Sequence, residues 1–209
     1  MKNMNWRYLI CILLVAGCTT SKITTSWKAP EINTKQYNKI LVLGLIYDKD
    51  RSLQQKLEQH LIGDLANLGY NAVSALAEYG PKTFNDMNEK QALEKIKNSG
   101  VDAVITIILL DKEKERNYLN GHNLYYGPFW DYLESRNSRI IEPGYYVTDT
   151  KYFWESNYYD MSTQSLLYSV QTKSFNPANT EKLGHEYGKL IVKNMKEEAL
   201  LQKRKAPGK

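Results

Sequence analysis

Cysteine is nearly missing from this sequence of 209 residues, because Cys11 and Cys18 lie near the start and none follows. A disulfide framework is therefore excluded for the rest of the chain. Glycine-rich phosphate loops are also missing, since the turn at 47–51 carries two aspartates where a phosphate would bind. No Gly-x-Ser-x-Gly motif occurs, and the three histidines have no partner at metal-ligand spacing. We find no catalytic signature and expect no metal and no cofactor.

The composition is that of a globular protein, with 42% hydrophobic residues, 24% charged residues and a formal charge of +5. A charge of this size favours no particular partner. The length favours one domain over two, and no internal repeat is visible.

The N-terminus has the layout of a secretory signal peptide. Lys2 and Arg7 precede nine apolar residues at 8–16, and small or branched residues follow up to Cys18. Nine residues are too few to span a bilayer, which takes about 20. We expect residues 1–17 to be removed, which lowers the side-chain charge from +5 to +3 because Lys2 and Arg7 leave with them.

The segment Leu14-Val15-Ala16-Gly17-Cys18 resembles the lipobox of bacterial lipoproteins. The resemblance implies that the Cys18 thiol carries a diacylglycerol and that its new amino group receives a third chain. Each buried methylene adds about 0.8 kcal/mol, so two or three chains form a durable membrane anchor. Thr19 after the cysteine implies the outer membrane, facing the periplasm, by the sorting pattern of enteric lipoproteins. The alternative is cleavage elsewhere, with Cys18 left as a plain thiol.

Residues 18–38 are predicted to form the lipidated N-terminus and a tether, because 19–38 are polar and lack an apolar period. Trp27 stands out in this segment. It either packs on the edge of the domain or contacts a partner.

Residues 39–202 are predicted to form the folded domain. Residues 39–47 and 103–110 are almost continuously apolar, as in strands covered on both faces. Leucines at helical spacing predict a helix over 51–68, and a short strand follows at 71–74. A capping box at 86–89 predicts a second helix that ends at Gly100.

The second half predicts a strand at 145–160 and another at 166–175, which should be antiparallel neighbours because only about six residues separate them. A final helix should start at a Thr180 cap, and 203–209 form a basic tail. We therefore predict an α/β fold, a single three-layer domain with a mixed, mainly parallel sheet. Its order is β-α-β-α-β followed by two antiparallel strands and a long C-terminal helix.

The chain resembles a group of uncharacterised bacterial cell-envelope lipoproteins. The likeness rests on the lipobox, the Ser26-Trp27-Lys28-Ala29-Pro30 segment, the strand Lys39-Ile40-Leu41-Val42-Leu43-Gly44-Leu45, Arg51 with Glu58, Gly100-Val101-Asp102-Ala103-Val104 and Leu167-Tyr168-Ser169-Val170-Gln171-Thr172. Ala29 and Tyr168 depart from the acidic residue and the tryptophan that this pattern favours. The resemblance implies location and fold, and no reaction.

Aromatic residues are concentrated in 118–159, which holds thirteen of the twenty-four in the chain. Tyr and Trp combine apolar area with a polar group, which suits protein interfaces and sugar faces. The residues predicted to bind a partner or ligand are Trp130, Tyr132, Tyr125, Tyr126 and Trp154. The alternative is that the long connection at 117–144 folds its aromatics over the sheet as a satellite core.

Two functions remain open from the sequence. The first is a non-catalytic envelope lipoprotein that docks a protein partner or an envelope glycan through the aromatic segment. The second is a hydrolase of an envelope polymer, with a carboxylate pair among Glu134, Glu142, Asp149 and Glu155. The mixed charges at 112–116 are typical of a solvated strand end, and an exported protein is not expected to bind nucleic acid.

Overall fold

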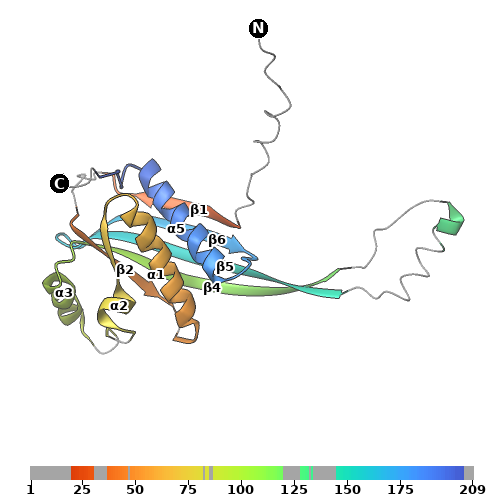
Figure 1. The fold of residues 1–209 in the computed structure, drawn as a ribbon, viewed down its shortest axis with the longest axis horizontal. Coiled ribbons are helices and arrows are strands. Elements are labelled where there is room, and N and C mark those ends of the chain that lie inside the picture. Colours follow the sequence, from red (N-terminus) through yellow and green to blue (C-terminus); the bar gives the residue numbers. More distant parts are fainter. Residues whose placement is uncertain are drawn as a thin grey trace, which may run out of the picture.

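The computed structural model describes residues 20–30, 37–46, 48–81, 83–84, 87–119, 128–131, 133 and 145–204. These residues form one six-stranded sheet with the strand order β1-β6-β5-β4-β2-β3 (Figure 1). The strands are β1 (Ser21–Lys28), β2 (Lys39–Leu45), β3 (Asn71–Ser74), β4 (Ala103–Leu119), β5 (Tyr145–Asp160) and β6 (Ser165–Phe175).

The sheet is mixed, as predicted, but it is not mainly parallel. β2 pairs in parallel with β3 and with β4. The described pairs β4–β5, β5–β6 and β6–β1 are all antiparallel, so antiparallel pairings outnumber parallel ones. The apolar runs of β2 and β4 correctly predict the parallel half. The prediction of a parallel majority fails because β5 joins β4 in antiparallel orientation and β1 adds a further antiparallel strand at the edge.

β1 corrects the prediction of a tether over 18–38. It is an edge strand in which only Ser21 is buried, so it lacks the apolar alternation by which a strand is recognised. Its threonines and isoleucine suit an extended backbone, and β6 supplies the hydrogen-bonding partner. Trp27 lies on this strand and is about half exposed.

Side chains also tie β1 to the final helix, α5 (Thr180–Glu197). The backbone N–H of Thr20 donates to the Glu186 carboxylate at 2.9 Å, and its hydroxyl donates to the same oxygen at 2.5 Å. At the other end of the strand, Lys28 Nζ donates to the carbonyl oxygen of Glu198 at 3.0 Å. The described chain is therefore held to the domain from its first residue.

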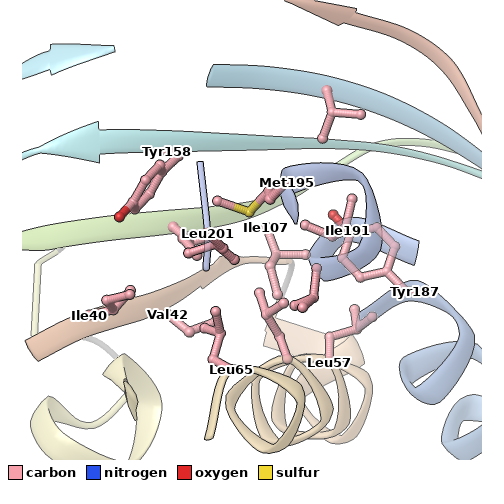
Figure 2. Close-up of a cluster of buried hydrophobic side chains, with 14 of the residues drawn as sticks. Ile40, Val42, Leu57, Leu65, Ile107, Tyr158, Tyr187, Ile191, Met195 and Leu201 are labelled. Carbon is pink, nitrogen blue, oxygen red and sulfur yellow. The ribbon is translucent and has the colours of Figure 1, made fainter. Parts of the chain in front are cut away.

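α1 (Arg51–Ala66) and α5 cover one face of the sheet and enclose the main core (Figures 1 and 2). The predicted leucine stripe of α1 is confirmed, since Leu53, Leu57, Leu61 and Leu65 are all buried. Burial of a leucine side chain contributes about 1.5–3 kcal/mol. The other labelled residues of this core in Figure 2 are Ile40, Val42, Ile107, Tyr158, Tyr187, Ile191, Met195 and Leu201.

Two glycines allow α1 and α5 to pack closely. A Cβ on Gly184 would lie 3.2 Å from the carbonyl oxygen of Lys56, and a Cβ on Gly188 would lie 3.1 Å from the backbone nitrogen of Leu61. The two glycines are four residues apart and so lie on the same face of α5. Because glycine has no side chain, the backbones of α1 and α5 approach each other closely at these two positions.

α2 (Ala75–Tyr79) and α3 (Glu89–Asn98) contribute to a second cluster on the opposite face of the sheet. Leu41 and Val104 project into this cluster, while their strand neighbours Ile40 and Ala103 project into the main core. The second cluster covers only the end of the sheet that holds β2, β3 and the start of β4.

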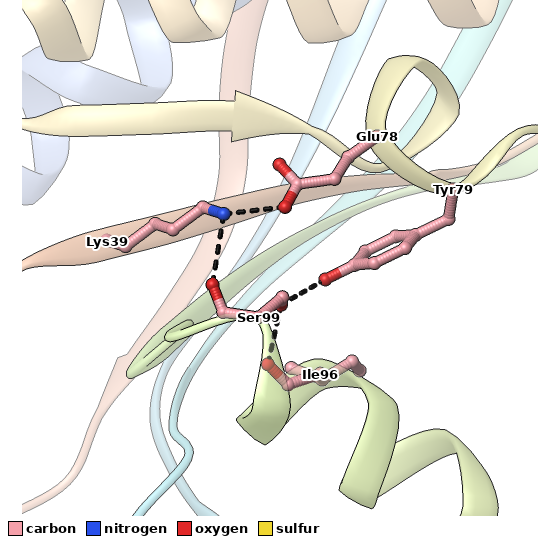
Figure 3. A network of polar contacts seen from close by, with 5 residues as sticks. All are labelled: Lys39, Glu78, Tyr79, Ile96 and Ser99. Carbon is pink, nitrogen blue, oxygen red and sulfur yellow. Dashed lines mark hydrogen bonds and ion pairs between the residues drawn. The ribbon is translucent and has the colours of Figure 1, made fainter.

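Polar contacts join the elements at this end of the sheet (Figure 3). Lys39 Nζ on β2 donates to Glu78 at 2.6 Å and to the carbonyl oxygen of Ser99 at 3.1 Å. The Ser99 hydroxyl donates to the carbonyl oxygen of Ile96 at 2.7 Å and bonds the Tyr79 hydroxyl. One lysine thus connects the first residue of β2 with α2 and with the end of α3.

A buried carboxylate connects α1 with the ends of β2 and β3. Glu58 is fully buried and accepts hydrogen bonds from the backbone N–H of Gly44 at 2.9 Å and of Leu76 at 3.2 Å. It also accepts from Gln54 Nε2 at 3.0 Å and from the Ser74 hydroxyl. Four donors compensate for the loss of water around this charge.

The helix starts differ from the prediction by a few residues. α3 begins at a capping box formed by Asn88 and Gln91, not at residues 86–89. α5 is capped by Asn179, whose side chain accepts from the backbone N–H of Lys182 at 2.8 Å, and Thr180 is its first helical residue. In both cases an asparagine takes the position because it is an excellent N-cap.

Candidate functional site: the two-stranded ribbon

β4 and β5 continue beyond the rest of the sheet and past the ends of α1 and α5 (Figure 1). The pairing of β4 with β2 ends at Ile108, and the pairing of β5 with β6 ends at Lys151. Beyond Ile108, β4 pairs only with β5, and after an irregularity at Leu110 their register is unbroken as far as Leu119 and Tyr145. At the base of this segment, residues 151–153 of β5 also pair with the end of β6. We call residues 111–119 of β4 and 145–153 of β5 the ribbon.

The ribbon shows that β4 is longer than predicted. The sequence predicts a strand over 103–110, whereas β4 has 17 residues. The charged run at 112–116 gives no apolar signal, and its extended state depends on the pairing with β5. A bulge at Leu110 separates the buried part of β4 from the ribbon and increases the local twist.

Asn176 fixes the base of the ribbon, where β6 ends. Its backbone N–H donates to the carbonyl oxygen of Thr150 at 2.9 Å, and its Oδ1 accepts from the N–H of Thr150 at 2.6 Å. Its amide also donates to the Asp149 carboxylate, to which Asn117 Nδ2 donates at 2.7 Å from β4. Asn176 has a φ of +43°, in the left-handed region that asparagine tolerates well.

The outer end of the ribbon carries exposed aromatic rings. Tyr118 and Tyr146 lie opposite each other with ring centroids 5.0 Å apart, edge to face. The Arg116 guanidinium carbon lies 4.0 Å from the centroid of the Tyr146 ring. Tyr118, Tyr145 and Tyr146 are 51%, 62% and 58% exposed. We call these three tyrosines the outer tyrosines.

The described aromatics of the predicted binding segment fall into two groups. Trp130 is exposed, and its ring contacts Phe129 at a centroid distance of 5.6 Å. Trp154 is fully buried, is stacked on Tyr152 and packs against Tyr187 of α5. Trp154 therefore belongs to the core and offers no surface to a partner.

The other predicted binding residues, Tyr125, Tyr126 and Tyr132, lie outside the described residues, as does Cys18. The sequence reasoning did not single out Tyr118, Tyr145 and Tyr146 among the thirteen aromatics of the segment. Tyr118 follows the charged run at 111–116, and Tyr145 and Tyr146 lie at the start of β5, which pairs with the end of that strand. These positions separate them from Tyr158, which lies in the core.

The carboxylates predicted for a hydrolase do not form a catalytic pair in the described residues. Asp149 and Glu155 are six positions apart on one extended strand, which separates their backbones by about 20 Å. Glycosidases need carboxylates about 5–9.5 Å apart. Glu155 accepts hydrogen bonds from Asn157 at 2.9 Å and from Gln171 at 3.2 Å. Glu134 and Glu142 lie outside the described residues.

Two histidines lie together between α1 and α5, with a centroid distance of 5.6 Å between His60 and His185. His60 contacts Glu181 at 2.7 Å, and Lys56 contacts the same carboxylate at 2.8 Å. The lysine and then the histidine lower the pKa of Glu181, and burial raises the pKa of the nearby Asp64. The described part of the chain holds no group of three or more side chains that could ligate a metal ion.

In the described segments, no helix has both the length and the apolar character needed to cross a membrane.

No protein-family model matches this chain, and no curated protein is similar to it in sequence. Among solved structures, the PelC dodecamer from Paraburkholderia phytofirmans is similar, with 12% identity and a TM-score of 0.46, over 88% of this chain and 99% of that one. Lipoprotein GNA1162 from Neisseria meningitidis is similar with 15% identity and a TM-score of 0.41, over 78% and 98%. A PDZ domain protein from Parabacteroides distasonis is similar with 9% identity and a TM-score of 0.42, over 84% of this chain and 35% of that one. Likeness at this level identifies no family and transfers no function.

Proposed function

We propose that this chain is a lipid-anchored protein of the bacterial cell envelope with a non-catalytic docking role. In this proposal the ribbon binds a protein partner through the outer tyrosines, and the lipid on Cys18 holds the domain at the outer membrane, facing the periplasm. The observation that carries the docking role is the exposure of Tyr118, Tyr145 and Tyr146 on a continuously paired ribbon.

The fold does not need these three exposed aromatic rings for its stability. The outer tyrosines add nothing to either core cluster, whereas Tyr158 on the same strand is 1% exposed. Tyrosine in a fixed, exposed position supplies contact area at a low cost in side-chain entropy. The exposed, two-stranded form of the ribbon supports a protein partner, since a sugar chain is better held in a concave site.

The position of the N-terminus supports the same arrangement. The carbonyl oxygen of Thr20 accepts a hydrogen bond from the backbone N–H of Phe175, at the end of β6 where the ribbon begins. Cys18 precedes Thr20 by two residues, which span at most about 7 Å. A lipid on Cys18 therefore holds the base of the ribbon close to the membrane surface, without a long tether.

The anchor is tested by Cys18→Ser. We expect the variant to accumulate as precursor or to leave the membrane fraction, because no acyl chain then holds it. A Cys11→Ser variant is the matched control, since Cys11 lies in the segment that is removed. Normal processing and full membrane retention of Cys18→Ser would contradict the lipoprotein assignment.

The docking role is tested by affinity capture from solubilised envelopes, with partners identified by mass spectrometry. Tyr118→Ala/Tyr146→Ala should lose the partner captured by the wild type. Replacement of Tyr79, which lies on α2 away from the ribbon, by Phe is the matched control and should keep it. Equal capture by both variants contradicts the docking role, and binding of an envelope glycan in place of a protein contradicts the choice of partner.

A further inference from the structure

Charges of opposite sign lie on opposite faces of the ribbon. Residues 111–116 read Asp-Lys-Glu-Lys-Glu-Arg, so positive and negative side chains alternate. Successive residues of a strand point to opposite faces of a sheet. One face of the ribbon therefore carries the cations of this run, and the other face carries the anions.

The basic face bears Lys112, Lys114 and Arg116. It is on the same side of the sheet as α1, since Lys112 lies 4.0 Å from Asp50, directly before that helix. The residues of β5 opposite these cations are tyrosines and threonines, and none is acidic. They are Tyr152, Thr150 and Thr148, with Tyr146 one pair further out. Within the described chain, Lys114 forms no ion pair.

The acidic face bears Asp111, Glu113, Glu115 and Asp149. Lys151 lies on this face and contacts Glu115 at 2.7 Å, which raises the pKa of the lysine. Lys173 of β6 lies on the same side, over the ring of Phe153 at the base of the ribbon. Two lysines against four carboxylates leave this face negative. The three acidic residues of β4 are exposed, and no helix covers them in the described structure.

The two faces match in spacing as well as in sign. Side chains on one face of a strand recur every two residues, about 6.6–6.8 Å, so the three cations and the three anions of β4 have the same period. Two stacked β-layers lie about 10 Å apart, a separation that long lysine, arginine and glutamate side chains bridge.

We infer that the partner of the ribbon is a second copy of this chain, with the basic face of one ribbon stacked on the acidic face of the next. The inference rests on the proposed docking role and names its partner. In a pair, each copy keeps one unused face that can bind a further copy, so the contact is heterologous and builds a ring or an open chain. Side-by-side joining of strand edges is disfavoured, because charged residues at an edge oppose it.

The salt dependence of self-association tests this without any substitution. Sedimentation velocity of the complete lipoprotein in a density-matched detergent should show oligomers at about 0.1 M salt and monomers at about 1 M salt, where the screening length falls from about 10 to 3 Å. A monomer at both salt concentrations overturns the inference. So does an oligomer that is unaffected by salt.

Charge reversal assigns the association to the two faces. Lys112→Glu/Lys114→Glu/Arg116→Glu has two acidic faces, and Asp111→Lys/Glu113→Lys/Glu115→Lys has two basic faces. Each variant alone should associate at least about tenfold more weakly than the wild type, and an equimolar mixture should regain association. Failure of the mixture to associate, when both variants unfold cooperatively, overturns the inference.

A control variant with the same change in net charge shows whether association depends on the charges of the ribbon or on the net charge of the chain. Lys90→Glu/Lys97→Glu/Lys196→Glu reverses three cations on α3 and α5, away from the ribbon. It should associate like the wild type, and loss of association would overturn the assignment to the ribbon. If either triple ribbon variant fails to fold, the milder Lys114→Gln and Glu113→Gln take its place, and each should weaken association.

The inference and the proposed function fail in different ways. A chain that stays monomeric but captures another protein through the outer tyrosines contradicts the second copy and leaves the docking role standing. Binding of anionic lipid vesicles to the basic face of a chain that does not self-associate would likewise contradict the second copy and leave the docking role standing. A chain that neither self-associates nor captures a partner contradicts both.

Discussion

Truncation of single aromatics along β5 should separate two roles within one strand. Trp154 is fully buried against Tyr187, whereas Tyr146 is 58% exposed on the ribbon. Trp154→Ala should lower the free energy of unfolding by about 3–5 kcal/mol, the usual cost of removing a large buried ring. Tyr146 contributes one aromatic pair and one exposed cation–π contact, so Tyr146→Ala should cost only about 1 kcal/mol.

Equilibrium unfolding in urea measures both variants, and affinity capture provides the second readout. Tyr146→Ala should keep the slope and nearly the midpoint of the wild-type transition and lose partner capture. Trp154→Ala should lower the urea midpoint. At temperatures where this variant remains folded, it should still capture the partner. A loss of 3 kcal/mol or more in Tyr146→Ala would refute the reasoning, because its ring would then be a core element.

Three further predictions concern the body of the domain. Glu58→Ala should cost about 3–5 kcal/mol in urea unfolding, since it leaves buried N–H donors unpaired, and a cost below about 1 kcal/mol would contradict the buried contacts. Gly188→Ala should lower the melting temperature because its Cβ meets the backbone of α1, whereas Gly63→Ala, with open space around it, should raise it slightly. Asp64→Asn should match or exceed the wild-type melting temperature at pH 7. Burial raises the pKa of Asp64, so the folded state holds the proton of this carboxyl more tightly than the unfolded state does. The stability that the protonated carboxyl contributes is fully present below the ordinary aspartate pKa and is lost as pH rises through the raised pKa. The difference between Asp64→Asn and wild type should therefore vanish in acid, and a variant less stable than wild type at pH 7 would show that the charge is favourable.

The elements with a strong apolar period are those that the sequence predicts well. The stripe of α1 is confirmed residue by residue, and β5 has the predicted bounds, Tyr145–Asp160. β6 is predicted to within one residue, and its antiparallel pairing with β5 is confirmed. In each case burial on one face leaves a repeat that can be read without knowledge of the partner element.

Elements that depend on a distant partner are missed or shortened. β1 is stabilised by β6 and by Glu186 of α5, at least 140 residues away in the chain, and its own residues are mostly exposed. The outer half of β4 is stabilised by cross-strand pairs with β5, such as Glu115 with Lys151. Hydrophobic patterns in a single sequence indicate which residues are buried. A pair of strands that is exposed to solvent has almost no such pattern.

The candidate site was located by composition and placed by topology. The excess of aromatics over 118–159 coincides with nearly all of β5 and with the outer end of β4, but composition does not separate the buried Trp154 from the exposed Tyr146. That separation follows from the point at which β6 ends and leaves β5 without a second neighbour. The same topology converts an alternating run of charges into two faces of opposite sign.

Photo-crosslinking in intact cells tests the docking role of the ribbon most directly. A photoreactive amino acid replaces Tyr146 in the membrane-anchored chain, and the control carries it at the exposed Lys90 on α3. The account predicts a discrete crosslinked product from position 146, with twice the mass of the chain if the partner is a second copy, and none from position 90. Absence of a product at 146, or equal products from both positions, would contradict it.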